Sequence, residues 1–393
     1  MNNKAVAIPV LPEHLIEEQI LPRLPVKSLI RFKSVSRSWL SVICSHDFKK
    51  LHLKFSSSCQ TQAIILKSRL AFPSCLLSFD NCNNFKNCVE LEANVILSNR
   101  FGPPYICQLV GSCNGLVCLC YLCACFFLWN PATNQSQKIN LPDSCYHMAS
   151  VFLRGVGFGY VSSIDDYRIG FVLGDFVHNP KVRAYIYSLR AREWITMTTV
   201  DSELCCDARN CVVVDDTLYL SCVTLPLCIP GLNLLSGQVK LFPLDGLPNF
   251  KHCKYQLSRM KGCLSLCQTG YSNKDGYKYV SDVWMLKQPD KWDSWEKLFS
   301  IRGDMYLHYV FETGKCLVSR EEQLKLIDPY DVAPEQFEEG TTFCQESRKG
   351  VELRDIYQTW SYVESFISPF GAFTSSEDED NSREIEIVES SDV

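Results

Sequence analysis

The chain has 393 residues and 46% hydrophobic content, enough for two or three domains with a sizeable core. Its formal charge is -5, but the last 17 residues carry -7, so the remainder is nearly balanced and we expect neither nucleic acid nor a membrane as partner. The 22 cysteines fall short of the roughly 8–10% that marks secreted disulfide scaffolds, and the short apolar stretch from Ala5 to Leu11 does not predict a secretory signal. We therefore expect a folded protein of the cytoplasm or nucleus, with mostly buried, reduced cysteines.

The first folded stretch predicts three or four short helices. Pro12 suits a first helical position, whereas Pro22 and Pro25 end one helix and begin the next. Ser36 can cap a third helix, and Asp47 can cap a last turn. Short isolated helices are marginal in water, and these carry more apolar residues than a helical hairpin can cover by itself. Either the rest of the chain or, as we favour, a partner protein covers them.

The spacing of Pro, Leu, Phe, Ser and Trp in this stretch carries a specific resemblance. Leu11-Pro12 is followed at residues 23–39 by RLPVKSLIRFKSVSRSW, and the whole closely resembles an F-box. In that family the helices dock on the Skp adaptor of cullin-based ubiquitin ligases, so the resemblance implies an adaptor and, through it, cullin and RING subunits as partners. It assigns adaptor binding to the following residues: Leu11, Pro12, Ile16, Ile20, Leu24, Pro25, Val26, Leu29, Phe32, Val35 and Trp39.

Basic side chains alternate with the apolar ones in this stretch, from Arg23 to Lys54. A nucleic-acid site is one interpretation, but the stretch has no aromatic stacking platform and the chain as a whole is acidic. We favour a solvated rim around a hydrophobic docking face.

From about Ala63 onward, short runs of Val, Ile, Leu, Tyr and Cys alternate with turn residues, which predicts many β-strands and no long helix. The longest apolar run, Leu116 to Trp129, is shorter than the roughly 20 residues that span a bilayer and predicts two buried strands. A loose repeat of strand pair, turn and strand ends near an aromatic residue, and these aromatics are 65, 48 and 53 residues apart: Trp129, Trp194, Phe242 and Trp295. This period favours propeller blades with insertions.

The segments GSCNGLVCL, LWNPATNQ, VGFGYVSSIDDYRI and AYIYSLRAREW resemble the F-box-associated domain, which is related to kelch propellers and follows the F-box in a large plant family. Members are substrate receptors of ubiquitin ligases, and some, the S-locus F-box proteins, recognise stylar ribonucleases. The resemblance implies an α+β multidomain chain with a small all-α F-box and an all-β, propeller-like domain. Regular double-glycine kelch turns are missing, which leaves open whether the propeller closes.

The end of the chain is acidic, with eight acids and one base in its last 17 residues, and it has too little apolar surface to offset the cost of ordering. Just before it, Tyr362–Phe370 is expected to form a closing strand. We divide the chain into a disordered N-terminus at 1–8, the F-box at 9–54, a connecting segment with the first strands at 55–104, the F-box-associated domain at 105–371, and a disordered acidic tail at 372–393.

Two motifs imitate catalytic sites. Gly111–Gly115 has the form of a nucleophile elbow centred on Cys113, which would make the chain a cysteine hydrolase. The residues that follow are strand-like rather than helical, so we favour a tight β-turn. Asp165-Asp166 is expected to form a hairpin turn rather than a catalytic carboxylate pair.

Two further motifs imitate ligand sites. Cys118, Cys120, Cys123 and Cys125 lack the two separated pairs of a structural zinc site, and strand alternation predicts plain packing. The glycine-rich run Gly155–Gly159 precedes no helix and is a poor phosphate loop.

We therefore predict a non-catalytic adaptor without metal or cofactor, which brings a protein target near a charged ubiquitin-conjugating enzyme and so raises its effective concentration. An F-box scaffold acting outside ubiquitination and the Cys113 hydrolase are the alternatives. The sequence does not name the target, and three connections are candidate recognition loops by position alone: Asp143–Ser150, Gly174–Lys181 and Leu225–Gly231.

Overall fold

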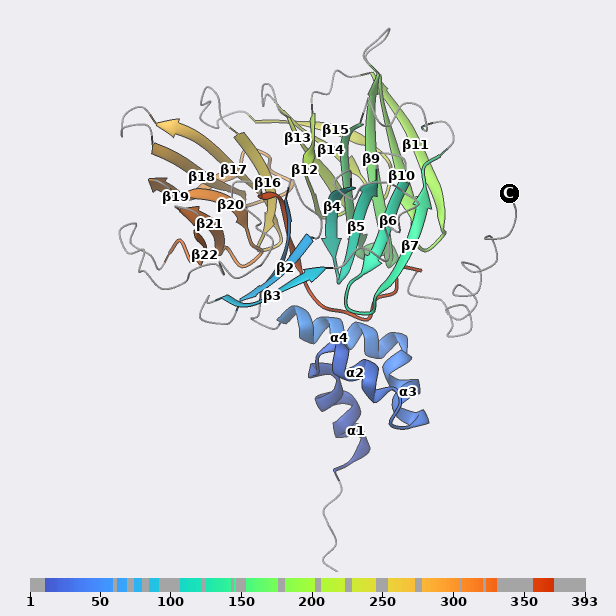
Figure 1. Cartoon of the computed structure of the whole chain (residues 1–393). Coiled ribbons are helices and arrows are strands. Elements are labelled where there is room, and N and C mark those ends of the chain that lie inside the picture. The colour runs from blue at the N-terminus through green and yellow to red at the C-terminus, as the bar shows by residue number, and fades with distance from the viewer. Residues whose placement is uncertain are drawn as a thin grey trace, which may run out of the picture.

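The computed structural model places a small helical domain against one end of a ring of β-sheets (Figure 1). It describes residues 11–58, 62–68, 74–79, 85–91, 107–121, 125–142, 145, 153–175, 181–201, 206–222, 228–244, 254–272, 278–303, 305–320, 323–330 and 356–370. The predicted disorder of residues 1–8 and of the acidic tail falls outside this part of the chain.

The helical domain is a succession of short elements. They are α1 (Glu13–Leu15), the π-helical turn η1 (Ile16–Ile20), the 3-10 turn η2 (Leu21–Arg23), α2 (Val26–Phe32), α3 (Arg37–Cys44) and α4 (His46–Ser58). The predicted caps are partly right. The Ser36 hydroxyl accepts the backbone N–H of Trp39 at 3.1 Å, as expected.

The last helix differs from the prediction. α4 has 13 residues rather than a single turn, and its cap is Ser45, whose hydroxyl accepts the N–H of Phe48 at 3.2 Å. Asp47 lies within the first turn of α4, where its negative charge interacts favourably with the positive end of the helix dipole but does not cap the helix. The extra length lets α4 run along the end of the propeller (Figure 1).

Beyond the helices, the described strands form five four-stranded sheets and one three-stranded sheet, all antiparallel and arranged radially (Figure 1). The first sheet contains β1 (Gln62–Ser68), β2 (Ser74–Phe79), β3 (Phe85–Leu91) and the last strand, β23 (Ile356–Tyr362). The second contains β4 (Cys107–Cys113), β5 (Leu116–Tyr121), β6 (Cys125–Asn130) and β7 (Gln135–Asn140). The third contains β8 (Leu153–Val161), β9 (Asp166–Asp175), β10 (Lys181–Ser188) and β11 (Glu193–Asp201), with the 3-10 turn η6 (Ser162–Ile164) between β8 and β9.

The remaining sheets follow in chain order. The fourth contains β12 (Cys206–Val214), β13 (Thr217–Cys222), β14 (Cys228–Asn233) and β15 (Val239–Pro243). The fifth contains β16 (Lys254–Met260), β17 (Cys263–Ser272), β18 (Lys278–Leu286) and β19 (Trp295–Gly303). The sixth contains β20 (Tyr306–Val310), β21 (Cys316–Arg320) and β22 (Gln323–Ile327). The four aromatics that mark the repeat in the sequence fall one in each of the second to fifth sheets, which confirms the propeller.

The ring is closed, which settles the question that the sequence left open. Each innermost strand contacts the next, from β4 through β8, β12, β16 and β20 to β23 and back to β4. Closure comes from pairing of the two ends of the domain, since β23 pairs with β1 and places Trp360 opposite Ile65. The prediction of the closing strand was wrong in position: the strand is Ile356–Tyr362, and residues 363–370 after it do not form a strand.

Sheets pack on one another through the alternating faces of their strands. On β5, Cys118 and Cys120 belong to the core shared by the second and third sheets, which confirms the packing interpretation. On β8, the glycines of the Gly155–Gly159 run allow close approach: a Cβ at Gly157 would lie 2.2 Å from a methyl group of Leu218. The run is therefore a strand at a sheet interface rather than a phosphate loop. Among the described residues, no helix is sufficiently long and apolar to cross a membrane.

Candidate functional site

The helical domain is rich in exposed apolar side chains. Six of the ten large, exposed apolar side chains among the described residues lie on it: Leu11, Leu15, Ile20, Ile30, Val35 and Leu40. Val35 is 61% exposed and Leu11 is 52% exposed. Apolar side chains gathered in so short a stretch indicate a surface that a partner covers.

The eleven residues assigned to adaptor binding divide into three groups by burial. Five are exposed, namely Leu11, Pro12, Ile20, Pro25 and Val35, and four are half-buried, namely Ile16, Leu24, Phe32 and Trp39. Val26 and Leu29 are completely buried within this chain, so they lie beneath the surface rather than on it, and their assignment to adaptor binding stays a prediction. Three further apolar side chains of the helical domain, Leu15, Ile30 and Leu40, are exposed and were not among the eleven. The sequence contained a signal for them, because each is an apolar residue next to another apolar residue that is buried or half-buried: Ile16, Leu29 and Trp39.

A small core holds these helices together. Leu21, Val26, Leu29, Ile43 and Phe48 form it, and Phe366 from the far end of the chain completes it. Beside this core, the rings of Phe32 and Trp39 meet edge to face with centroids 5.5 Å apart, which fixes α2 against α3. The half-buried members of the surface are thus held in place by packing.

The helical domain also makes polar contacts with the propeller. Asp165, which has a left-handed backbone in the predicted hairpin turn before β9, accepts from Lys50 Nζ at 2.9 Å and from the Tyr160 hydroxyl at 2.5 Å. His46 lies 3.9 Å from the same carboxylate. The hydrogen bond from the Tyr160 hydroxyl, together with Lys50, lowers the pKa of the Asp165 carboxyl. Burial of the Tyr160 hydroxyl and its bond to Asp165 raise the pKa of Tyr160 to about 12. The carboxylate is therefore ionised and ties α4 to the propeller.

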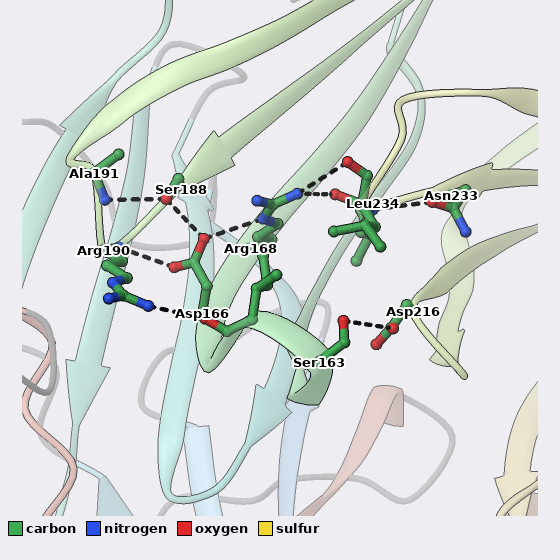
Figure 2. A network of polar contacts seen from close by, with 11 residues as sticks. Ser163, Asp166, Arg168, Ser188, Arg190, Ala191, Asp216, Asn233 and Leu234 are labelled. Carbon is green, nitrogen blue, oxygen red and sulfur yellow. Dashed lines mark hydrogen bonds and ion pairs between the residues drawn. The ribbon is translucent and has the colours of Figure 1, made fainter.

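The neighbouring Asp166 is occupied in a different way. Figure 2 shows its buried carboxylate between Arg168 Nε at 3.0 Å, the Ser188 hydroxyl at 2.7 Å and the backbone N–H of Arg190 at 2.9 Å. Arg168 in turn donates to the Leu234 carbonyl of the next sheet. Both carboxylate oxygens of Asp165 and of Asp166 already accept hydrogen bonds from the protein, so this pair of aspartates is structural, as the hairpin prediction implied. Neither this ion pair within β9 nor the hydrogen bond from Arg168 to the fourth sheet was predicted.

Cys113 lacks the surroundings of a nucleophile. It ends β4, and Asn114 and Gly115 follow with φ of 51° and 85° before β5 begins, so a strand stands where an elbow needs a helix. Burial raises the pKa of the Cys113 thiol to about 11, which keeps it protonated near neutral pH. The tight-turn prediction is confirmed, and the geometry does not favour the hydrolase.

The cysteine cluster likewise does not converge on a metal. Cys118 and Cys120 lie in one core and Cys125 in another, on the opposite face of the sheet, while Cys123 falls outside the described residues. Across the part of the chain that the structure describes, no three His, Cys, Asp or Glu side chains gather as metal ligands would.

Comparison with known proteins agrees with this architecture. The F-box domain family matches residues 9–51, and the F-box associated beta propeller domain family matches residues 63–368. An F-box/kelch-repeat protein of Arabidopsis thaliana is 29% identical over 309 residues, covering 75% of this chain and 80% of the relative. The F-box protein CPR1 of the same plant is 25% identical over 319 residues, covering 73% and 72%.

Among solved structures, Hsv2 of Kluyveromyces lactis matches with 12% identity and a TM-score of 0.33, covering 69% of this chain and 74% of that one. So low a score adds nothing to the argument, which depends on the two family matches. Since those matches span the helical domain and the sheets in turn, the chain belongs to the plant F-box proteins that carry an F-box associated β-propeller domain.

Proposed function

We propose that this protein is the target receptor of a Skp-cullin-F-box ubiquitin ligase. The observation that carries the proposal is the exposed apolar surface of the F-box, with Val35, Leu11 and Ile20 accessible to a Skp-family adaptor. The propeller then holds a protein target, which is ubiquitinated by proximity rather than by catalytic groups of this chain. A cytoplasmic or nuclear location fits this role.

The topology supports a target site on the end of the propeller away from the F-box. The β8–β9 turn lies on the F-box side, since Asp165 contacts Lys50, and the Ser163 hydroxyl donates to Asp216 of the β12–β13 turn at 3.4 Å beside it. In antiparallel sheets the next connections, β9–β10 and β13–β14, leave from the opposite end. Two candidate loops, Gly174–Lys181 and Leu225–Gly231, belong to these connections, and Asp143–Ser150 precedes β8 on the same side. Most of their residues lie outside the described part of the chain.

A matched pair of surface variants tests adaptor docking. Val35→Asp places a charge in the docking face at a position that is 61% exposed, so the fold should survive while affinity for a purified Skp-family adaptor falls at least about tenfold. Leu241→Asp is the control, because Leu241 is 50% exposed on β15 of the propeller. Calorimetry measures both affinities, and equal binding by the two variants would contradict the proposal.

Mass spectrometry of proteins that co-purify from plant cells separates a ligase subunit from an F-box scaffold. Cullin and RING subunits should accompany the adaptor on the wild-type chain and disappear with Val35→Asp. Targets are best trapped with the same variant, because deletion of the F-box would uncover Phe366, which the F-box core encloses. A ribonuclease among the trapped proteins would support the S-locus-like interpretation.

A further inference from the structure

The eight residues after the closing strand run between α4 and the propeller (Figure 1). Two neighbours in this segment, residues 363–370, enter two different cores. Phe366 packs into the F-box core with Leu21, Val26, Leu29, Ile43 and Phe48. Ile367, the next residue, packs into the core between the second and third sheets of the propeller.

The propeller holds this segment by its backbone. The Asn130 side-chain amide, fully buried at the end of β6, donates to the carbonyls of Ser365 at 2.9 Å and Ile367 at 2.8 Å. The Ser365 hydroxyl donates to the Asn114 carbonyl at 2.5 Å, and its oxygen would lie 2.2 Å from a Cβ at Gly115. A side chain at Gly115 would therefore displace the segment, so the β4–β5 turn is shaped around it.

The F-box holds the Phe366 ring from several sides. The ring meets His52 of α4 edge to face at 5.2 Å between centroids, and Lys33 Nζ at the end of α2 lies 5.7 Å from its centre. The His52 ring is itself fixed by the Leu24 carbonyl, 3.0 Å from its Nε2. α2, α4 and the turn that carries Leu24 thus meet around one side chain that is more than 300 residues away in sequence.

From these contacts we propose that residues 363–370 couple the two domains, so that the F-box takes its docking shape only on a closed propeller. Phe366 is a positioning residue: it is only 4% exposed and belongs to the same core as Leu29, which lies beneath the exposed docking face. β23 closes the ring immediately before this segment. The strand that closes the propeller and the side chain that enters the F-box core are therefore neighbours in the chain. The proposal rests on adaptor docking as the proposed function.

Four full-length variants test the coupling through adaptor affinity. Phe366→Ala should weaken binding at least about tenfold, and Phe366→Leu should recover affinity to within about threefold, because it refills most of the cavity. Phe370→Ala is the matched control: it lies in the same segment, outside the F-box core, and should change affinity less than about twofold. The Ser365 hydroxyl bonds to Asn114 and Ile367, so Ser365→Ala removes an anchor on the propeller and should cause a smaller fall than Phe366→Ala.

Hydrogen exchange in the adaptor-free chain distinguishes coupling from general unfolding. Phe366→Ala should raise amide exchange in α2 and α4 but not in β16–β19 on the other side of the ring. Two results would overturn the proposal: Phe366→Ala behaving like Phe370→Ala in both measurements, or exchange rising as much in β16–β19 as in α2. If the wild-type chain does not bind the adaptor, the proposed function is wrong. The hydrogen-exchange measurement then still shows whether Phe366 couples the F-box to the propeller.

Discussion

The F-box and the interface between the second and third sheets are both rich in apolar residues, yet they use them in opposite ways. At the sheet interface Phe126, Phe171 and Tyr185 are at most 2% exposed, and the Phe171 and Tyr185 rings stack with centroids 4.8 Å apart. On the F-box, Val35 and Ile20 remain 61% and 42% exposed. Apolar content alone therefore does not distinguish a core from a docking surface. What distinguishes them is whether neighbouring elements of the same chain cover the apolar side chains.

The physical reason lies in the size of the elements. Sheets stacked around a ring cover both of their faces, so every apolar side chain of β5 finds a neighbour on one side or the other. α2 and α3 have seven and eight residues, and so little helix encloses one narrow core. The residues left outside that core are available to another protein.

The largest effect is expected from breaking the F-box core rather than its surface. Leu29→Asp buries an unpaired charge beside Val26 and Phe366 and should unfold the F-box helices, at a cost of about 4–5 kcal/mol. Adaptor binding and helical circular dichroism should therefore fall together, whereas Val35→Asp loses binding with the helical signal intact. A Leu29→Asp chain with unchanged helical signal would show that the division into core and surface is wrong.

A second test weakens the sheet interface. Phe171→Ala removes a ring that contacts Phe126, Tyr185 and Trp194, and should lower the free energy of unfolding by about 3–5 kcal/mol. Urea denaturation measures the loss, with Leu241→Ala on the exposed edge strand β15 as a control expected to stay within about 0.5 kcal/mol. Similar losses for the two variants would contradict the assignment of Phe171 to the core.

The third test uses pH, which acts on a buried histidine in the F-box and on a half-buried one in the propeller. Burial lowers the pKa of His52 in the F-box, and lowers that of His308 in the propeller to about 4. An unfolded chain protonates these rings near pH 6.5, so between pH 6.5 and about 4 it binds more protons than the folded chain. Stability should fall as the pH falls through this window, by on the order of 3 kcal/mol for His308.

Urea titrations at pH 7 and pH 4.5 check the pH dependence. His308→Gln should reduce the difference between them, and Gln can keep a hydrogen bond to Ser319, whose hydroxyl lies 2.7 Å from His308 Nε2. An unchanged pH dependence in His308→Gln would show that this ring is not its source.

The smallest effect is expected at the C-terminus. The propeller family match ends at residue 368, so removal of residues 375–393 should leave both the melting temperature and adaptor affinity unchanged within error. Truncation from residue 363 removes Phe366 as well and should abolish high-affinity docking. A lower melting temperature after the shorter truncation would place the tail within the fold.

Local signals in the sequence were sufficient for the F-box motif and for the strand-rich body of the chain, but not for the length of α4 or the position of β23. The spacing of Leu11, Pro12, Leu24, Pro25 and Trp39 identified the F-box, because short helices depend on caps and prolines that lie within a few residues. Turn residues likewise marked the hairpins of the propeller. Asn114, Asp165, Asp215 and Asp216 all have positive φ where the chain reverses, a conformation that Asn and Asp tolerate.

Tertiary structure alone decided what distant residues do to one another. Asn130 meets Ile367 across 237 residues, Phe366 completes a core begun at Leu21, and β23 pairs with β1. The hydrophobic periodicity of the sequence does not predict such long-range contacts, because each residue fits the pattern of its own helix or strand whichever residue packs against it. The family resemblance assigned Val26 and Leu29 to adaptor binding, and the fold places both in a core that Phe366, from the other end of the chain, helps to form.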